Sequence, residues 1–116
     1  MLAFTITGRL PSLNEVIGAN RANKYGGASL KKQAEALILP QLPHATQSGK
    51  CHVTFRWHCP NTRRDPDNIA SAQKFILDAM QSAGIIDNDG WRQVASLNHT
   101  FTVAGTDYVE VELTDV

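Results

Sequence analysis

The sequence predicts an α+β fold: a single compact domain with a mostly antiparallel four-stranded sheet and two helices, in the order β-α-β-α-β-β. Its 116 residues are enough for one domain and too few for two. Four segments have the composition of strands, and two further segments fit helices. These segments together fit a sandwich of one sheet packed against helices.

The first half of the chain is expected to contain two strands and one helix. Residues 2–8 alternate between apolar and polar side chains, as a strand does, and end at a proline turn. Residues 15–29 are polar and contain glycines, which predicts an exposed loop. Ser29 is expected to cap a helix over 30–39. Residues 50–59 alternate again, which predicts a half-buried strand.

The second half is expected to contain one long helix and a hairpin. Residues 66–83 place apolar side chains on one side of a helix: Ile69, Ala72, Ile76, Ala79, Met80 and Ala83. Gly84 is positioned to end this helix. Residues 93–103 and 107–114 read as two strands, and the short segment between them predicts a hairpin connection.

Charge is unevenly distributed along the chain, although the net charge is zero. Residues 1–64 hold nine lysines and arginines and two acids, whereas residues 65–116 hold two lysines or arginines and nine acids. A basic region can bind phosphates while an acidic one holds cations. The alternative is that the two halves mix in the folded protein and the asymmetry has no functional meaning.

The cysteines and the N-terminal residues predict a cytoplasmic protein that is not embedded in a membrane. Cys51 and Cys59 stand eight residues apart in one predicted strand, too far apart for a disulfide, so reduced thiols are expected. Neighbouring histidines lack the spacing typical of a zinc site. No apolar run is long enough to span a bilayer, and the first residues lack the basic region of a signal peptide.

The strongest chemical signal is an acidic pair that follows two arginines. Arg63 and Arg64 precede Asp65, and Asp67 comes two residues later. Carboxylates are the ligands that Mg²⁺ prefers, and guanidinium groups bind phosphate. A simpler interpretation is that Asp65 caps the helix, with Pro66 in its first position. The two interpretations are compatible.

Three further residues support a functional interpretation of the acidic pair. Lys74 is expected two turns along the same helix face as Asp67. Asp87 and Asp89 lie in a second acidic loop after the helix, for which an Asx-rich turn is the simpler interpretation. Asp89 can approach the first pair only if the following strand returns beside the start of the helix.

With these motifs the chain resembles the RusA-type Holliday-junction resolvases, which are small phage and prophage endonucleases. The matching residues are Arg63 to Asn68, Leu77-Asp78-Ala79, Ala83 to Ile86, the acidic loop and Gln93-Val94, with Leu10 to Asn14 resembling the family's first turn. The resemblance touches most of the chain, which would make residues 1–116 one RusA-like endonuclease domain. Its specific part is the central third.

The resemblance implies a catalytic set. Asp65 and Asp67 match the paired catalytic aspartates, Asp89 best matches the third, and Lys74 best matches the catalytic lysine. Asp87 is the alternative third metal ligand, because the loop reads Asp-Asn-Asp where the family has adjacent acids. Lys74 also follows the pair by nearly two turns, where the type member has one. The resemblance further implies Mg²⁺, a homodimer, symmetric nicks in four-way DNA junctions, and a bacterial or prophage origin.

The expected function is therefore Mg²⁺-dependent, structure-selective cleavage of four-way DNA junctions in recombination and repair. The residues expected to bind DNA are Arg63, Arg64, Lys24, Lys31, Lys32, Arg21 and Asn14. The alternative is a non-catalytic protein of the same fold that binds branched DNA. An Asp-x-Asp site for a nucleotide-sugar enzyme is disfavoured, because the chain is too short for the usual nucleotide-binding sheet.

Overall fold

Strand β2 (Cys51–Cys59) lies inside the sheet of the computed structural model, which describes residues 1–116. Its odd-numbered side chains, from Cys51 to Cys59, are buried, and the intervening ones are partly exposed. This is the alternation that the sequence predicts. One face of β2 therefore contributes to the apolar core, while the other carries polar side chains.

The sheet has four strands in the order β1-β4-β2-β3, which confirms the predicted α+β class. β1 (Leu2–Thr7) and β2 both pair antiparallel with β4 (Tyr108–Asp115). β3 (Val94–Val103) pairs parallel with β2, so the sheet is mixed.

The predicted hairpin between the last two strands is wrong, because β2 lies between β3 and β4. The helical crossover after β2 returns the chain parallel to it along one edge, as such connections usually do. β4 then takes the other edge of β2, where Val109, Val111 and Leu113 are buried. The strand with the stronger apolar alternation thus occupies the more central position.

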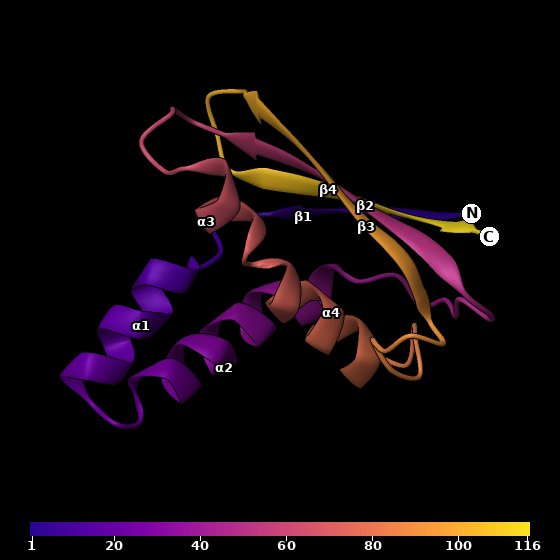
Figure 1. Ribbon diagram of the computed structural model, residues 1–116, viewed down its shortest axis with the longest axis horizontal. Coiled ribbons are helices and arrows are strands. Elements are labelled where there is room, and N and C mark those ends of the chain that lie inside the picture. Colours follow the sequence, from indigo (N-terminus) through magenta and orange to yellow (C-terminus); the bar gives the residue numbers. More distant parts are fainter.

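Figure 1 shows the helices on one side of the sheet, with the opposite face left open. They are α1 (Leu13–Ala22), α2 (Gly26–Ile38), the short 3-10 helix η1 (Leu39–Gln41), α3 (Pro66–Ala70) and α4 (Gln73–Ser82). The buried apolar residues form one core between this layer and the sheet. None of these helices has the length and apolar character needed to cross a membrane.

The predicted loop over residues 15–29 is wrong, because α1 and the start of α2 occupy it. α1 buries no side chain, so it lacks the apolar stripe that marks most helices. It is held instead at its start. The amide of Leu13 donates to Ser71 Oγ at 2.9 Å, and the amide of Asn14 donates to Asn68 Oδ1 at 3.2 Å. Side chains of α3 and the turn after it therefore satisfy amides that the helix itself leaves free.

The predicted Ser29 cap is also wrong, since α2 begins at Gly26 after a tight turn. A Cβ atom at Gly26 would come within 2.2 Å of the Ala19 carbonyl oxygen, so only glycine fits. The amide of Gly27 donates to Asn20 Oδ1 at 2.8 Å, which fastens the turn to α1. Gly26 and Gly27, which suggested a loop, instead allow α1 and α2 to pack closely at the turn between them.

The predicted helix over 66–83 is divided at residues 71–72 into α3 and α4. Ser71 Oγ donates to the carbonyl of Asn68 at 2.6 Å, and Lys74 N bonds to Ser71 O three residues back. A serine hydroxyl that competes for a backbone carbonyl weakens a helix locally. The predicted cap at Gly84 is confirmed: its φ is +77°, and the amide of Ile85 bonds to the carbonyl of Met80 at 2.9 Å.

Candidate functional site

Asp65 occupies the N-cap position of α3, with φ −71° and ψ 149°, and Pro66 follows as the first helical residue. Its backbone carbonyl accepts a hydrogen bond from the Ile69 amide at 3.0 Å. Its side chain makes no capping hydrogen bond, and it is exposed. The backbone of Asp65 therefore starts the helix, whereas its carboxylate is left available for another partner.

Asp67 stands in the first turn of α3 and is also exposed. Its Oδ1 accepts a hydrogen bond from the neighbouring Asn68 amide at 2.9 Å. Neither Asp65 nor Asp67 takes part in an ion pair. Two carboxylates without a cation thus lie two residues apart in the sequence at the start of a helix, where the helix dipole favours negative charge.

Lys74 joins the second acidic loop to the helix layer. Its Nζ lies 3.0 Å from Asp78 Oδ1 and 3.1 Å from Asp89 Oδ2. Hydrogen bonds to Asp78 and Asp89 raise the pKa of the Lys74 ammonium, so it stays protonated at neutral pH. Asp78 also lies 3.6 Å from Lys31 Nζ on α2. The structure therefore brings Lys74 and Asp89 together, with the side chain of Lys74 still 65% exposed.

The loop with Asp87 and Asp89 lies toward the start of β2, whereas Asp65 follows the end of that strand. Because β3 is parallel to β2, Val94 pairs with Cys51, and only the far end of β3 reaches the neighbourhood of α3. No group of three or more His, Cys, Asp or Glu residues is arranged to hold a metal ion. The return of Asp89 to the first acidic pair, which the expected three-carboxylate site requires, is not seen in this chain.

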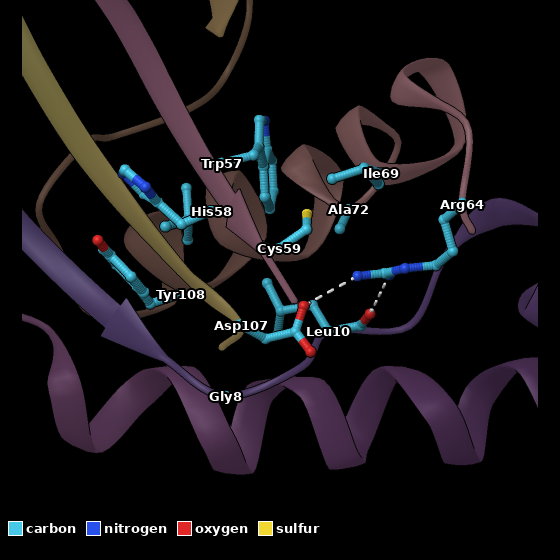
Figure 2. A pocket seen from close by; sticks show the side chains of 11 residues that line it. Gly8, Leu10, Trp57, His58, Cys59, Arg64, Ile69, Ala72, Asp107 and Tyr108 are labelled. Atoms are coloured by element: carbon cyan, nitrogen blue, oxygen red, sulfur yellow. Dashed lines mark hydrogen bonds and ion pairs between the residues drawn. The ribbon is translucent and has the colours of Figure 1, made fainter. Parts of the chain in front are cut away.

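Arg64 points into the protein (Figure 2). Its Nη2 donates to Asp107 Oδ1 at 3.1 Å, and its Nη1 donates to the Leu10 carbonyl at 3.4 Å. The side chains of Arg64 and Asp107 are only 22% and 20% exposed. Together they border a cavity of about 20 Å³, large enough for about one water molecule. Arg64 therefore clamps the loop before α3 to two other segments.

Arg63, in contrast, is exposed and forms no ion pair. It lines an open cleft of about 320 Å³ together with Arg9, Asn61 and Asp107. Arg9 is held by two contacts to Glu15, which raise the pKa of Arg9 and lower that of Glu15. Arg63 is thus the arginine beside the acidic pair that remains free to meet an anion.

The other cations expected to bind DNA gather on the α1–α2 hairpin, which projects away from the sheet in Figure 1. Arg21, Lys24 and Lys32 are exposed and form no ion pair, and Lys24 Nζ lies 4.9 Å from the centre of the Tyr25 ring. Lys31 is partly neutralised by Asp78. The exposed Asn14 begins this hairpin on the side next to α3.

Part of the charge asymmetry along the chain disappears on folding. Three ion pairs join a basic residue of the first half to an acidic residue of the second: Lys31 with Asp78, Arg56 with Glu112, and Arg64 with Asp107. Most of the unpaired charges keep the separation: cations on the α1–α2 hairpin and at Arg63, and acids at Asp65, Asp67 and Asp87. Glu35 on α2 and Arg92 are the exceptions.

One cluster near α4 was not anticipated from the sequence. The Trp57 indole N–H donates to His99 Nδ1 at 2.9 Å, and His99 Nε2 lies 3.0 Å from Gln73 Oε1. An indole can only donate, so His99 must be neutral with its proton on Nε2. Burial lowers the pKa of His99, which agrees with this state. His99 therefore ties β2 and β3 to the residue that precedes Lys74.

No protein-family model matches this chain, and no curated protein matches it either. The chemistry available at the surface is nevertheless definite. Two carboxylates without an ion-pair partner stand beside an unpaired arginine. A protonated lysine, Lys74, stands on the next helix, α4, beyond the break that follows α3. Mg²⁺ is usually held by one or two carboxylates together with substrate phosphates, so Asp65 and Asp67 fit this ion by their donor chemistry.

Proposed function

We propose that this protein is a Mg²⁺-dependent endonuclease that hydrolyses phosphodiester bonds in four-way DNA junctions. The observation that carries the proposal is the side chain of Asp65. A residue at the N-cap normally uses its carboxylate to bond amides of the first turn, and Asp65 does not. With Asp67 it forms an exposed pair of hard oxygen ligands next to Arg63.

In this proposal Asp65 and Asp67 bind Mg²⁺ jointly with a phosphate of the substrate. Bound Mg²⁺ would supply an acidified water and neutralise charge on the transferring phosphate. Asp89 is the third candidate ligand and Asp87 its alternative. Asp89 is now bonded to Lys74 and lies toward the opposite end of β2 from Asp65, so its recruitment requires its loop to move as well as a change of partner when metal and DNA bind.

Lys74 acts in this scheme as a fixed positive charge and not as a base. Its two carboxylate partners favour the ammonium form, and a protonated amine stabilises the negative charge that grows on phosphate oxygens. Its exposure allows a DNA strand to approach it. The loss of Lys74 is therefore expected to lower the rate of cleavage more than the affinity for DNA.

The DNA backbone would be held by the unpaired cations Arg63, Arg21, Lys24 and Lys32. Affinity that rests on such contacts falls steeply with salt concentration, because bound cations release counterions from DNA. A four-way junction has two-fold symmetry, so a homodimer with two equal sites fits it best. The proposed location is the cytoplasm, where DNA and reduced cysteines are both found.

The test uses a labelled four-way junction and a linear duplex of matched sequence, each incubated with the protein with and without Mg²⁺. Cuts confined to the junction and dependent on Mg²⁺ would support the proposal. Equal cutting of both substrates would make the protein a general nuclease. Asp67→Asn should bind the junction and fail to cut it, whereas Asp115→Asn, an identical change at the far end of β4, should cut normally. Full cleavage by Asp67→Asn would refute the assigned site.

A second candidate is a non-catalytic protein that binds branched DNA. It is favoured by the pairing of Asp89 with Lys74 and by the absence of a three-carboxylate group. This candidate requires that junction binding is the same with and without Mg²⁺ and that no nicks appear. The same two substrates therefore decide between the two candidates.

A further inference from the structure

Trp91 is the most unusual exposed residue of the protein. Its side chain is 91% exposed, whereas the other tryptophan, Trp57, is only 5% exposed. Tryptophan is on average highly buried, so an indole held almost wholly in water beside other exposed apolar surface is a candidate for binding a partner. Trp91 stands two residues after Asp89, in the loop that bonds to Lys74 and that lies toward the opposite end of β2 from Asp65.

The loop that carries Trp91 has a defined conformation. The carbonyl of Gly90 accepts hydrogen bonds from the amides of Gln93 at 3.1 Å and Val94 at 3.0 Å. The amide of Asp89 donates to Asn88 Oδ1 at 2.9 Å, and the Asp89 carboxylate is bonded to Lys74. Both sides of Trp91 are therefore anchored, so the indole is presented on a prearranged turn.

Trp91 forms one wall of an open groove of about 350 Å³. Leu97, which is 41% exposed, contributes apolar surface from β3, and Asp89 lies at the groove's border with Lys74. The volume is close to the lower limit of ordinary small-ligand sites, which suits a flat aromatic ring. The groove thus offers an apolar slot that adjoins the residues proposed to meet the phosphate.

We propose that this groove binds a single unstacked nucleobase of a DNA strand whose backbone phosphate lies at the Lys74 ammonium. This inference rests on the proposed nuclease function and adds that one base of the bound DNA strand is unstacked. Aromatic side chains stack on any base. Two cations lie next to residues that line the groove: Lys74 bonds to Asp89, and Arg92, which is exposed and forms no ion pair, follows Trp91 in the chain. A nucleotide fits both features, because its base can stack in the apolar groove while its phosphate meets the cations. An apolar protein segment would leave the cations without a partner.

The experiment measures binding in the absence of divalent metal, so that cleavage does not interfere. The probes are a DNA duplex with one extrahelical 2-aminopurine and the same duplex with an abasic site at that position. The protein is expected to bind the first more tightly by about fivefold to a hundredfold. Binding should also quench tryptophan emission. Trp91→Phe should keep the preference for the base, whereas Trp91→Leu, which keeps apolar bulk without a ring, should lose it.

Two outcomes would overturn the inference. One is equal affinity of the unmodified protein for the base-containing and abasic duplexes. The other is tryptophan emission that changes with protein concentration in the absence of DNA but not in Trp91→Leu, which would mean that a second copy fills the groove. A preference for the base without any junction cleavage in Mg²⁺ would refute the nuclease and support the groove. Junction cleavage in Mg²⁺ together with an unchanged base preference in Trp91→Leu would support the nuclease and refute the groove.

Discussion

Replacing Arg64 by methionine is expected to lower the free energy of unfolding by about 2 kcal/mol. The magnitude follows from the clamp that Arg64 makes with Asp107 and Leu10. Both charged side chains are about one-fifth exposed. The pair therefore lies between a fully buried one, whose breaking costs about 3–5 kcal/mol, and a surface pair worth about 0–1 kcal/mol. Methionine keeps much of the apolar stem, so packing losses stay small.

Urea unfolding measures this effect. A loss of about 2 kcal/mol should move the unfolding midpoint down by about 1 M in urea. A double-mutant cycle with Asp107→Asn isolates the pair and should give a coupling energy of about 1–2 kcal/mol. Arg63→Met is the matched control, because Arg63 is exposed and unpaired, and its effect should stay within about 0.5 kcal/mol.

The result that refutes the clamp is specific. If Arg64→Met unfolds at the same urea concentration as the unmodified protein but binds the junction with a smaller salt dependence, Arg64 contacts phosphate as the sequence predicts. Its contacts to Asp107 and Leu10 would then contribute nothing measurable. A stability loss in Arg64→Met with an unchanged salt dependence supports the structural role.

Three further expectations concern the fold. The folded-state pKa of His99 lies below its unfolded value of about 6.5, so the unfolded chain binds more protons. The free energy of unfolding should therefore fall as pH drops below about 6.5. Urea unfolding midpoints at two pH values check this, and His99→Gln should lessen the change. Gly84→Ala forces alanine into φ +77° and should cost about 1 kcal/mol, seen as a lower melting temperature, although nothing blocks the added methyl group. Met80→Ala removes a fully buried side chain and should cost about 2–5 kcal/mol by the same measurement, and a smaller loss would mean that the core collapses around the cavity.

The elements that sequence predicts well are those with a local periodic signal. β2 alternates over its whole length, and the apolar stripe of residues 66–83 is buried in large part. Gly84 ends its helix as expected, because glycine alone adopts its backbone conformation cheaply. α1 has no buried side chain and therefore no stripe to detect. The Ser12-x-x-Glu15 spacing, typical of a helix start, was the available signal.

The residues of the candidate site also differ in whether their roles follow from local sequence. The backbone role of Asp65 is local and could be predicted, whereas the partner of Arg64 is Asp107, far along the chain and near no motif. The place of Asp89 depends on whether β3 runs parallel or antiparallel to β2. Strand direction within a sheet is set by the crossover and by competition for the central position, which local patterns do not encode.

The position of β1 has a consequence for the rate of folding. Its only partner in the sheet is β4, with Leu2 opposite Leu113, so this pairing joins nearly the two ends of the chain. Pairing at such long separation slows folding, because chain entropy is lost before the contacts form. The two termini lie side by side (Figure 1). In a circular permutant with the termini joined and the chain opened at Gly105, β4 and β1 would become a local hairpin, and the same native contacts would form faster.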